Sequence, residues 1–191
     1  MAERSIFLYE VREGADWLGS LERDLGRAGL HLKPPGSDLV TPYDDEGERL
    51  SMSEEELRRW VDAGHDARFS FWFAADHDVY CRIRESDGVT VIALGMDGCS
   101  RAEMESLRAA MEHRFLSRRT TSAGFVFDPD GVTEDYDWDR FFLAKERLDL
   151  SVENLPEALG VTRAELGRLV AVPAAAEVVD DGALVVIRAA R

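Results

Sequence analysis

Hydrophobic and polar positions follow two periods along the first part of the chain, one typical of strands and one typical of helices. Residues 5–11 are apolar on both faces, which predicts a strand in the interior of a sheet. Helical spacing of apolar residues predicts helices over residues 16–28 and 53–64, the second starting with an S-E-E-E capping box. The intervening segment, residues 30–52, contains three prolines and is expected to be an irregular loop.

The middle of the chain alternates with the period of strands. Residues 67–75, 78–84 and 89–95 predict a three-stranded meander, because turn-forming residues such as E-S-D-G separate the three runs. In residues 78–84, Val79, Cys81 and Ile83 alternate with Tyr80, Arg82 and Arg84. A second capping box predicts a helix over residues 100–116, and residues 122–128 predict another strand.

The pattern changes near residue 151. Residues 154–170 predict two short helices around Gly160, one with a start signal at Asn154 and Glu157 and the other with a start signal at Thr162 and Glu165. Residues 173–182 predict a loose linker or turn, and residues 183–191 a last strand. The sequence therefore predicts an α+β fold with a mostly antiparallel sheet of about five strands covered by helices, followed by a small helical hairpin and a final strand. We expect a core domain over residues 1–150 and a small appendage over residues 151–191.

Net charge is the most unusual property of the composition. With 23 basic and 38 acidic residues the chain carries −15, and residues 38–62 and 128–139 each contribute −6. Such a chain repels nucleic-acid phosphates and anionic membranes but attracts basic proteins at low salt. The 45% hydrophobic content suits a globular core. The strong preference for arginine over lysine is typical of GC-rich bacterial genomes.

Compartment follows from what the sequence lacks. The N-terminal stretch does not have the pattern of a signal peptide, and no apolar run reaches the roughly 18 residues of a membrane helix. Two cysteines provide neither a disulfide framework nor a zinc knuckle. These features predict a soluble, reduced, cytoplasmic protein that does not bind membranes.

The stretch from Asp128 to Asp139 holds six acids and no base, and three interpretations compete for it. An EF-hand calcium loop requires a glycine at its sixth position, but Gly131 comes at the fourth. A metal-dependent nuclease motif requires an acid two residues before a lysine, and Leu143 occupies that place before Lys145. A turn over D-P-D-G, followed by a helix capped by Asp137, explains more of the residues.

Other candidates for chemistry are weaker. Asp76, His77 and Asp78, with Cys81 three positions on, form the best metal-like cluster, although a solvated hairpin turn explains the three polar residues more simply. Cys99 precedes a predicted helix, where a thiol can be activated, but a structural cysteine is favoured. The common hydrolase, phosphate-binding and dinucleotide-binding motifs are absent. We therefore expect neither catalytic residues nor a cofactor or metal.

One segment resembles a known class of motif. Residues 156–170, PEALGVTRAELGRLV, resemble the helix-turn-helix units of bacterial DNA-binding proteins. The resemblance implies a turn over residues 159–162 and a recognition helix over residues 163–170, from which Arg163 and Arg168 would reach bases. A packed helical hairpin is the alternative, and the acidic residues of this segment favour it.

The localised charge leads to a functional hypothesis. We expect a non-catalytic protein that presents acidic surface to a basic protein partner, for example an immunity protein or antitoxin-like inhibitor of a toxin. A small transcriptional regulator, or a small-molecule binder or enzyme with a site under the loop of residues 30–52, are the alternatives. The residues expected to bind the partner are Asp44, Asp45, Glu46, Glu48, Asp130, Glu134 and Asp135.

Overall fold

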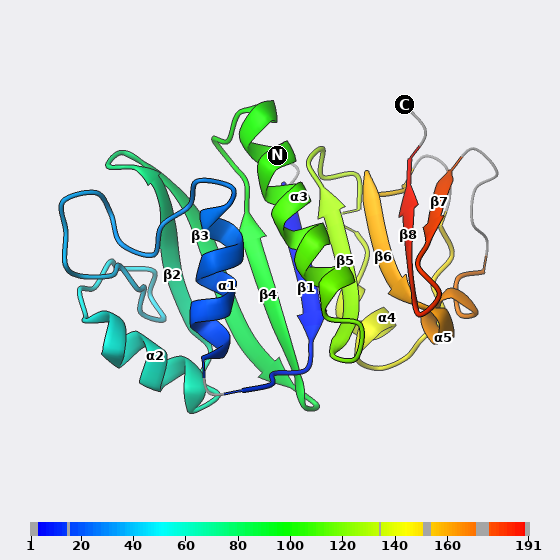
Figure 1. Cartoon of the computed structure of the whole chain (residues 1–191), viewed down its shortest axis with the longest axis horizontal. Helices are drawn as coiled ribbons and strands as arrows, with labels where there is room; N and C mark the ends of the chain where they lie inside the picture. Colours follow the sequence, from blue (N-terminus) through cyan, green and yellow to red (C-terminus); the bar gives the residue numbers. More distant parts are fainter. Residues whose placement is uncertain (1–3, 15, 134, 151–153, 171–175, 190–191) are drawn as a thin grey trace.

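The computed structural model describes residues 4–14, 16–133, 135–150, 154–170 and 176–189, and it has an α+β architecture (Figure 1). Within these ranges one antiparallel sheet has the strand order β2-β3-β4-β1-β5-β6-β8-β7. The predicted fold class and antiparallel pairing are confirmed, but the sheet has eight strands and not about five. The strands are β1 Ser5–Glu10, β2 Ala67–Ala74, β3 His77–Ser86, β4 Val89–Gly95, β5 Ser122–Asp128, β6 Ala158–Thr162, β7 Glu177–Asp180 and β8 Leu184–Arg188.

Helices α1, α2 and α3 lie on one face of this sheet. In Figure 1, α1 and α3 lie in front of the strands, and α2 lies at the lower left. The capping boxes predicted at Ser53 and Ser100 are present at the starts of α2 and α3. None of the helices in the described ranges combines the length and apolar character needed to cross a membrane. The helices are α1 Trp17–Gly26, α2 Glu54–Asp62, α3 Arg101–Ser117, α4 Trp138–Phe142 and α5 Arg163–Leu166.

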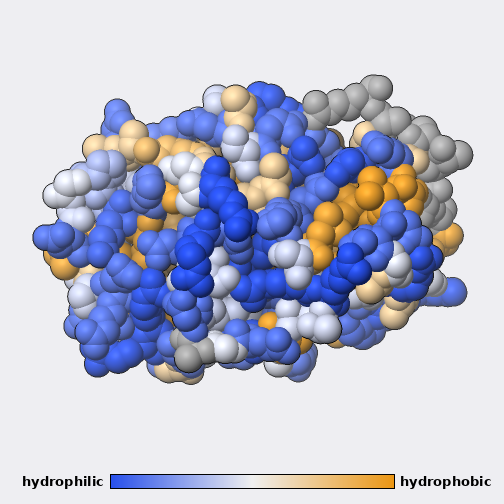
Figure 2. All heavy atoms as spheres, viewed as in Figure 1, coloured by the Kyte–Doolittle hydropathy of each residue, from blue (hydrophilic) through white to orange (hydrophobic). Residues whose placement is uncertain are grey.

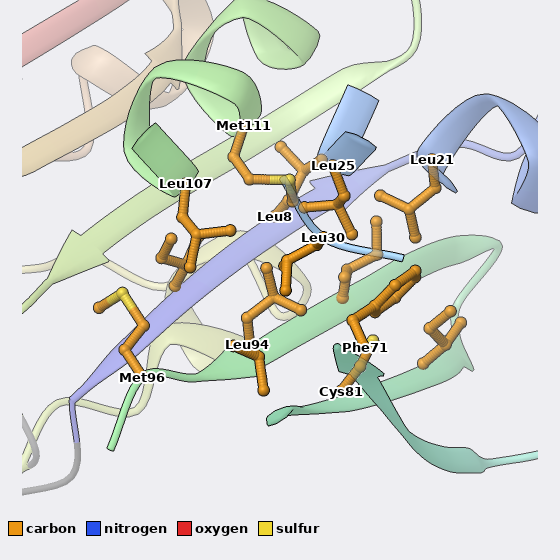
Figure 3. Close-up of a cluster of buried hydrophobic side chains, with 14 of the residues drawn as sticks. Leu8, Leu21, Leu25, Leu30, Phe71, Cys81, Leu94, Met96, Leu107 and Met111 are labelled. Carbon is orange, nitrogen blue, oxygen red and sulfur yellow. The ribbon is translucent and has the colours of Figure 1, made fainter. Parts of the chain in front are cut away.

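The main hydrophobic core fills the space between the sheet and helices α1, α2 and α3. Figure 3 shows leucines and methionines of α1 and α3 packed against side chains from several strands. Each of these side chains is at most 1% exposed, so the core excludes water. Burying a residue of this kind stabilises the fold by about 1.5–3 kcal/mol. Labelled examples are Leu8, Leu21, Leu25, Phe71, Cys81, Leu94, Leu107 and Met111.

Strand β1 lies at the centre of the sheet, as its apolar faces predict. It pairs with β4 on one side and with β5 on the other. Ile6 and Leu8 face the helices, and Tyr9 faces a second core on the opposite side. The second core contains Trp138, Phe141 and Phe142 of α4, so α4 packs on the sheet face that α1 and α3 do not cover.

The meander prediction is confirmed in pairing and in turn chemistry. Strands β2, β3 and β4 pair consecutively, with Ala75 and Asp76 forming the first turn. Asp87 and Gly88 form the second turn with φ values of 53° and 75°, both in the left-handed region that a two-residue hairpin of this kind requires.

The prediction of two helices over residues 154–170 is wrong. Ala158–Thr162 is strand β6, which pairs with β5 and β8, and only Arg163–Leu166 forms a helix. Alternation explains the strand, because Leu159 and Val161 face the second core while Gly160 lies against the ring of Phe115. The helix-turn-helix interpretation fails with it, since the proposed turn of residues 159–162 is part of the sheet. The start signal at Thr162 is confirmed as the cap of α5.

The prediction of a loose linker over residues 173–182 is also incorrect where the structure describes it. Glu177–Asp180 forms β7, which pairs with β8 at one end of the sheet. The expected last strand is present as β8. Figure 2 shows hydrophobic residues gathered over this end of the sheet, whereas polar residues cover most of the helical side.

An ionic cluster is buried between α1, α3 and β1. The Arg114 guanidinium donates to Glu10 through Nε at 3.1 Å and through Nη2 at 2.7 Å, and both side chains are 0% exposed. Arg114 also donates to Asp24 at 2.6 Å, and the Trp17 indole donates to Glu10. Charges can be held in a dry core only when they are paired and hydrogen-bonded in this way.

Candidate functional site

The sheet has a second face, turned away from α1, α2 and α3. On this face, β2 and β3 carry a group of arginine, tyrosine and tryptophan side chains that form the candidate site. Phe69 and Phe71 of β2 and Cys81 of β3 belong to the helical core. Because side chains alternate along a strand, the residues between them project from the opposite face. We call these side chains the outer sheet face: Arg68, Ser70, Trp72, Tyr80, Arg82 and Arg84.

Two arginines of the outer sheet face lie directly opposite each other on neighbouring strands. Arg68 of β2 pairs in register with Arg82 of β3. Asp66 lies beside both and accepts from Arg82 Nε at 2.9 Å and Nη2 at 2.6 Å. These hydrogen bonds from Arg82 are the main reason that the pKa of Asp66 lies below its usual value. Arg68 lies 3.6 Å from Asp66, which is longer than a hydrogen bond.

The third arginine of this face connects it to α4. Arg84 donates to Asp139, which also accepts from the hydroxyl of Tyr9 at 2.9 Å. Burial, and next the charge of Asp139, raise the pKa of Tyr9, so the phenol is a neutral donor. Asp139 lies in the first turn of α4, and its contacts with β1 and β3 depend on the fold.

At the β2 edge of the outer sheet face, a turn from the segment of residues 30–52 contacts the sheet. The Tyr43 hydroxyl lies 2.7 Å from Ser70 Oγ, and Ser70 donates to Asp78. The Arg49 guanidinium lies 5.9 Å from the centre of the Tyr43 ring and 5.6 Å from that of Trp72. This segment is therefore attached along β2 through specific contacts and is not a free loop.

Four of the predicted partner-binding residues form the tip of this turn, and we call them the acidic turn: Asp44, Asp45, Glu46 and Glu48. Asp44 Oδ1 accepts from the backbone N–H groups of Glu46 at 3.0 Å and Glu48 at 2.8 Å, which fixes the turn. Asp45 is fully exposed and lies 3.8 Å from Arg68. Glu46 and Glu48 are exposed and, among the described residues, take part in no ion pair.

The remaining predicted partner-binding residues follow β5. Asp130 and Asp135 are exposed, and Glu134 lies outside the described residues. They are far from the acidic turn, because β3, β4 and β1 separate β2 from β5. Four strand spacings of about 4.8 Å, or about 19 Å of sheet, separate β2 from β5. The structure therefore brings the acids together as two groups on either side of the sheet centre and not as one patch.

The turn interpretation of residues 128–139 agrees with the contacts seen there. Asp128 is buried, and its carboxylate accepts from the backbone N–H groups of Val132 and Thr133 and from the Thr133 hydroxyl. These three hydrogen bonds to the Asp128 carboxylate stabilise the turn that follows β5. Asp137 accepts from the N–H of Arg140 as the predicted cap of α4.

The metal-like cluster around His77 is divided by the fold. His77 lies 3.5 Å from Glu103, whereas Asp78 faces Tyr43 and Ser70. Burial raises the pKa of the Cys81 thiol, and burial also raises that of Cys99 to about 11, which makes both poor nucleophiles. In the part of the chain that the structure describes, no group of three or more histidine, cysteine or acidic side chains could hold a metal ion.

A pocket of about 500 Å³ lies on the helical side, away from the outer sheet face. It is lined by the end of α1 and by α3, and none of its lining residues comes from the segment of residues 30–52. Its lining residues are Arg27, Ser106, Ala109, Ala110 and His113.

The sequence did not single out the arginines of the outer sheet face as candidate site residues. The signal was available, because Tyr80, Arg82 and Arg84 already alternated with apolar residues in the predicted meander. Their position beside Arg68 and the acidic turn depends on strand register. Searches of protein-family models, curated proteins and solved structures return no match for this chain.

Proposed function

We propose that this protein is a non-catalytic binding module that receives a basic protein partner on its outer sheet face, as an immunity protein or antitoxin-like inhibitor receives a toxin. The acidic turn is the observation that carries the proposal. It holds four carboxylates at the border of the outer sheet face, on which Tyr80 is exposed, and its backbone is fixed by Asp44 and by the contacts of Tyr43 and Arg49 with the sheet.

Charge supports a basic partner. The chain carries −15, and a surface with such a field accelerates the association of oppositely charged proteins at low salt. The acidic turn and the pair Asp130 and Asp135 lie on either side of the sheet centre, so both can contact one partner of ordinary interface size. Added salt should slow association, because exposed charges are screened over about 8–10 Å at physiological ionic strength.

The composition of the outer sheet face supports a protein partner. This face exposes Tyr80 and Arg82, and tyrosine and arginine are enriched in the energetic centres of protein interfaces. Tyr80 is 39% exposed between Ser70 on β2 and Gly95 on β4, and its ring lies 5.7 Å from that of Tyr43. A surface held in place by a paired sheet loses little conformational entropy on binding.

The test begins with affinity capture from a lysate of the source cells, followed by kinetics with the captured protein. Changing Asp45, Glu46 and Glu48 to Lys should lower the association rate by tenfold or more at low salt, by the magnitude of electrostatic steering. Asp44 is left intact because it fixes the turn. The matched control changes Glu13, Glu55 and Asp97 to Lys. These three acids are exposed, and they belong neither to the acidic turn nor to the pair Asp130 and Asp135.

The control variant has the same net charge as the test variant and should associate much faster than it. Equal association rates for the two variants would show that only overall charge matters and would reject the acidic turn as the binding surface. Failure of the wild-type protein to capture any basic protein would reject the function itself.

A further inference from the structure

The strongest unexplained feature of the molecule is a strip of three arginines in a protein that is otherwise strongly acidic. Arg68 and Arg82 lie opposite each other, and Arg84 follows Arg82 at the next outward position of β3. Like charges directly opposite on neighbouring strands destabilise a sheet. A surface selected only for solubility would not require this arrangement.

The carboxylates near the strip leave donors unused. Asp66 accepts from Nε and Nη2 of Arg82, and among the described residues no partner is seen for Arg82 Nη1. Arg84 reaches Asp139 through Nη2 alone among those residues. Arg68 approaches Asp45 and Asp66 only at 3.8 Å and 3.6 Å. The strip therefore retains hydrogen-bond donors that a further anion could use.

We infer that Arg68, Arg82 and Arg84 form a binding site for a carboxylate side chain that the basic protein partner presents near the centre of the interface. The inference rests on the proposed function and adds a specific residue chemistry to it. Guanidinium groups bind carboxylates through paired, charge-assisted hydrogen bonds, which fix orientation as well as adding affinity. The acidic turn would then attract the partner, and the arginine strip would set how it docks.

Charge complementarity selects the carboxylate over a nucleic acid. A phosphate backbone carries a negative charge at each nucleotide, so it would meet the acidic turn next to the strip and the field of the whole chain. A basic protein with a single acidic side chain avoids this repulsion, because its cations face the acidic turn while its carboxylate faces the arginines. Tyr80, next to Arg82 on the same face, supplies apolar contact beside the site.

The test uses two short lysine-rich peptides that differ only at one central residue, glutamate or glutamine. The isotope-labelled protein is titrated with each peptide at low salt while the backbone amides and the arginine Nε–H groups are followed by NMR. Both peptides should shift the amides of the acidic turn. Only the glutamate peptide should shift the Nε–H signals of the arginine strip, and it should bind up to about fivefold more tightly, which corresponds to one exposed ion pair.

Variants separate a specific site from general electrostatics. Changing Arg82 to Gln makes the protein more negative, so attraction based on charge alone would strengthen the binding of both lysine-rich peptides. The inference predicts the opposite for the glutamate peptide relative to its glutamine counterpart, namely that its advantage disappears. The matched control is Arg23→Gln on α1, which removes an exposed arginine outside the outer sheet face and should leave that advantage unchanged.

The peptide titrations can reject the carboxylate site without rejecting the proposed function. Equal shifts with the two peptides, confined to the acidic turn, would overturn the carboxylate site and leave the proposed function standing. An advantage for glutamate that survives Arg82→Gln and Arg84→Gln together would also overturn the site. Absence of shifts at the acidic turn with either peptide would count against the proposed function as well.

Discussion

Two arginine–carboxylate pairs in this protein share one geometry and differ in their surroundings. Arg114 binds Glu10 through Nε and Nη2 inside the core, and Arg82 binds Asp66 through the same two nitrogens on the outer sheet face. The first pair is 0% exposed, whereas the side chains of the second are 41% and 36% exposed.

Exposure to solvent determines whether the arginine of each pair can exchange its carboxylate partner. Removal of Glu10 would leave the positive charge of Arg114 in a dry core, so this buried pair stays together for as long as the protein is folded. Water can replace Asp66 at little cost, so Arg82 is free to change its partner. The comparison explains why the outer arginines, and not the buried one, are suited to binding.

The largest effect is expected from Glu10→Gln, which leaves Arg114 buried without its main counter-charge. The free energy of unfolding should fall by about 3–5 kcal/mol, as measured by urea denaturation. A loss below about 1 kcal/mol would show that Asp24 alone satisfies Arg114 and would remove the contrast with the outer pair.

An intermediate effect is expected from Tyr9→Phe. Tyr9 is 1% exposed, and its hydroxyl donates to Asp139, whose side chain is 40% exposed. Loss of this hydrogen bond should lower the free energy of unfolding by about 1 kcal/mol, because water can still reach the carboxylate. An effect as large as that of Glu10→Gln would mean that Asp139 behaves as a buried charge.

A smaller effect is expected from Asp66→Asn, and it should depend on pH. Because the pKa of Asp66 is lower in the folded protein than in the unfolded chain, its contribution is complete above the unfolded value and is lost as pH falls through the folded value. At neutral pH the substitution should lower stability by less than about 1 kcal/mol, since the pair is exposed.

The difference between wild type and Asp66→Asn should therefore shrink once pH falls below the ordinary carboxyl pKa of about 3.9, and disappear below the lowered pKa of Asp66 in the folded protein. Urea denaturation at several pH values measures it. A difference that is constant down to the lowest pH would show that the Asp66 charge does not stabilise the fold.

The smallest effect is expected from the change of Asp45, Glu46 and Glu48 to Lys. These side chains are exposed, and the turn depends on Asp44, so the melting temperature should stay close to that of the wild type. Thermal denaturation measures this at moderate salt. A clear fall would mean that these three residues stabilise the fold, and their effect on binding could then not be separated from unfolding.

Local signals in the sequence predicted much of the first part of the fold. The hairpin turn at Asp87 and Gly88 and the caps at Ser53, Ser100 and Asp137 depend on neighbouring residues, and the structure has all of them. Strand β6 was missed because its five residues follow one helix start signal, at Asn154, and end on another, at Thr162. Its partners, β5 and β8, are distant in the chain, so only tertiary pairing shows that it is a strand.

For the candidate site too, local sequence signals predicted individual residues, but the contacts between strands could not be predicted. Charge counting identified the acidic turn, and alternation indicated that Arg82 and Arg84 leave the core. Their neighbours could not be predicted, because Arg68 meets Arg82 through strand register and Asp139 reaches Arg84 across 55 positions of sequence. Contacts of this kind are determined by the folded backbone and leave no periodic signal.

The central position of β1 has a consequence for synthesis. This strand leaves the ribosome before its neighbours β4 and β5, which end at Gly95 and Asp128. One edge of this apolar strand therefore stays unpaired until β4 has been made, and the other until β5 has been made. During that time the nascent chain is exposed to aggregation, and chaperones that shield β1 should increase the yield of folded protein.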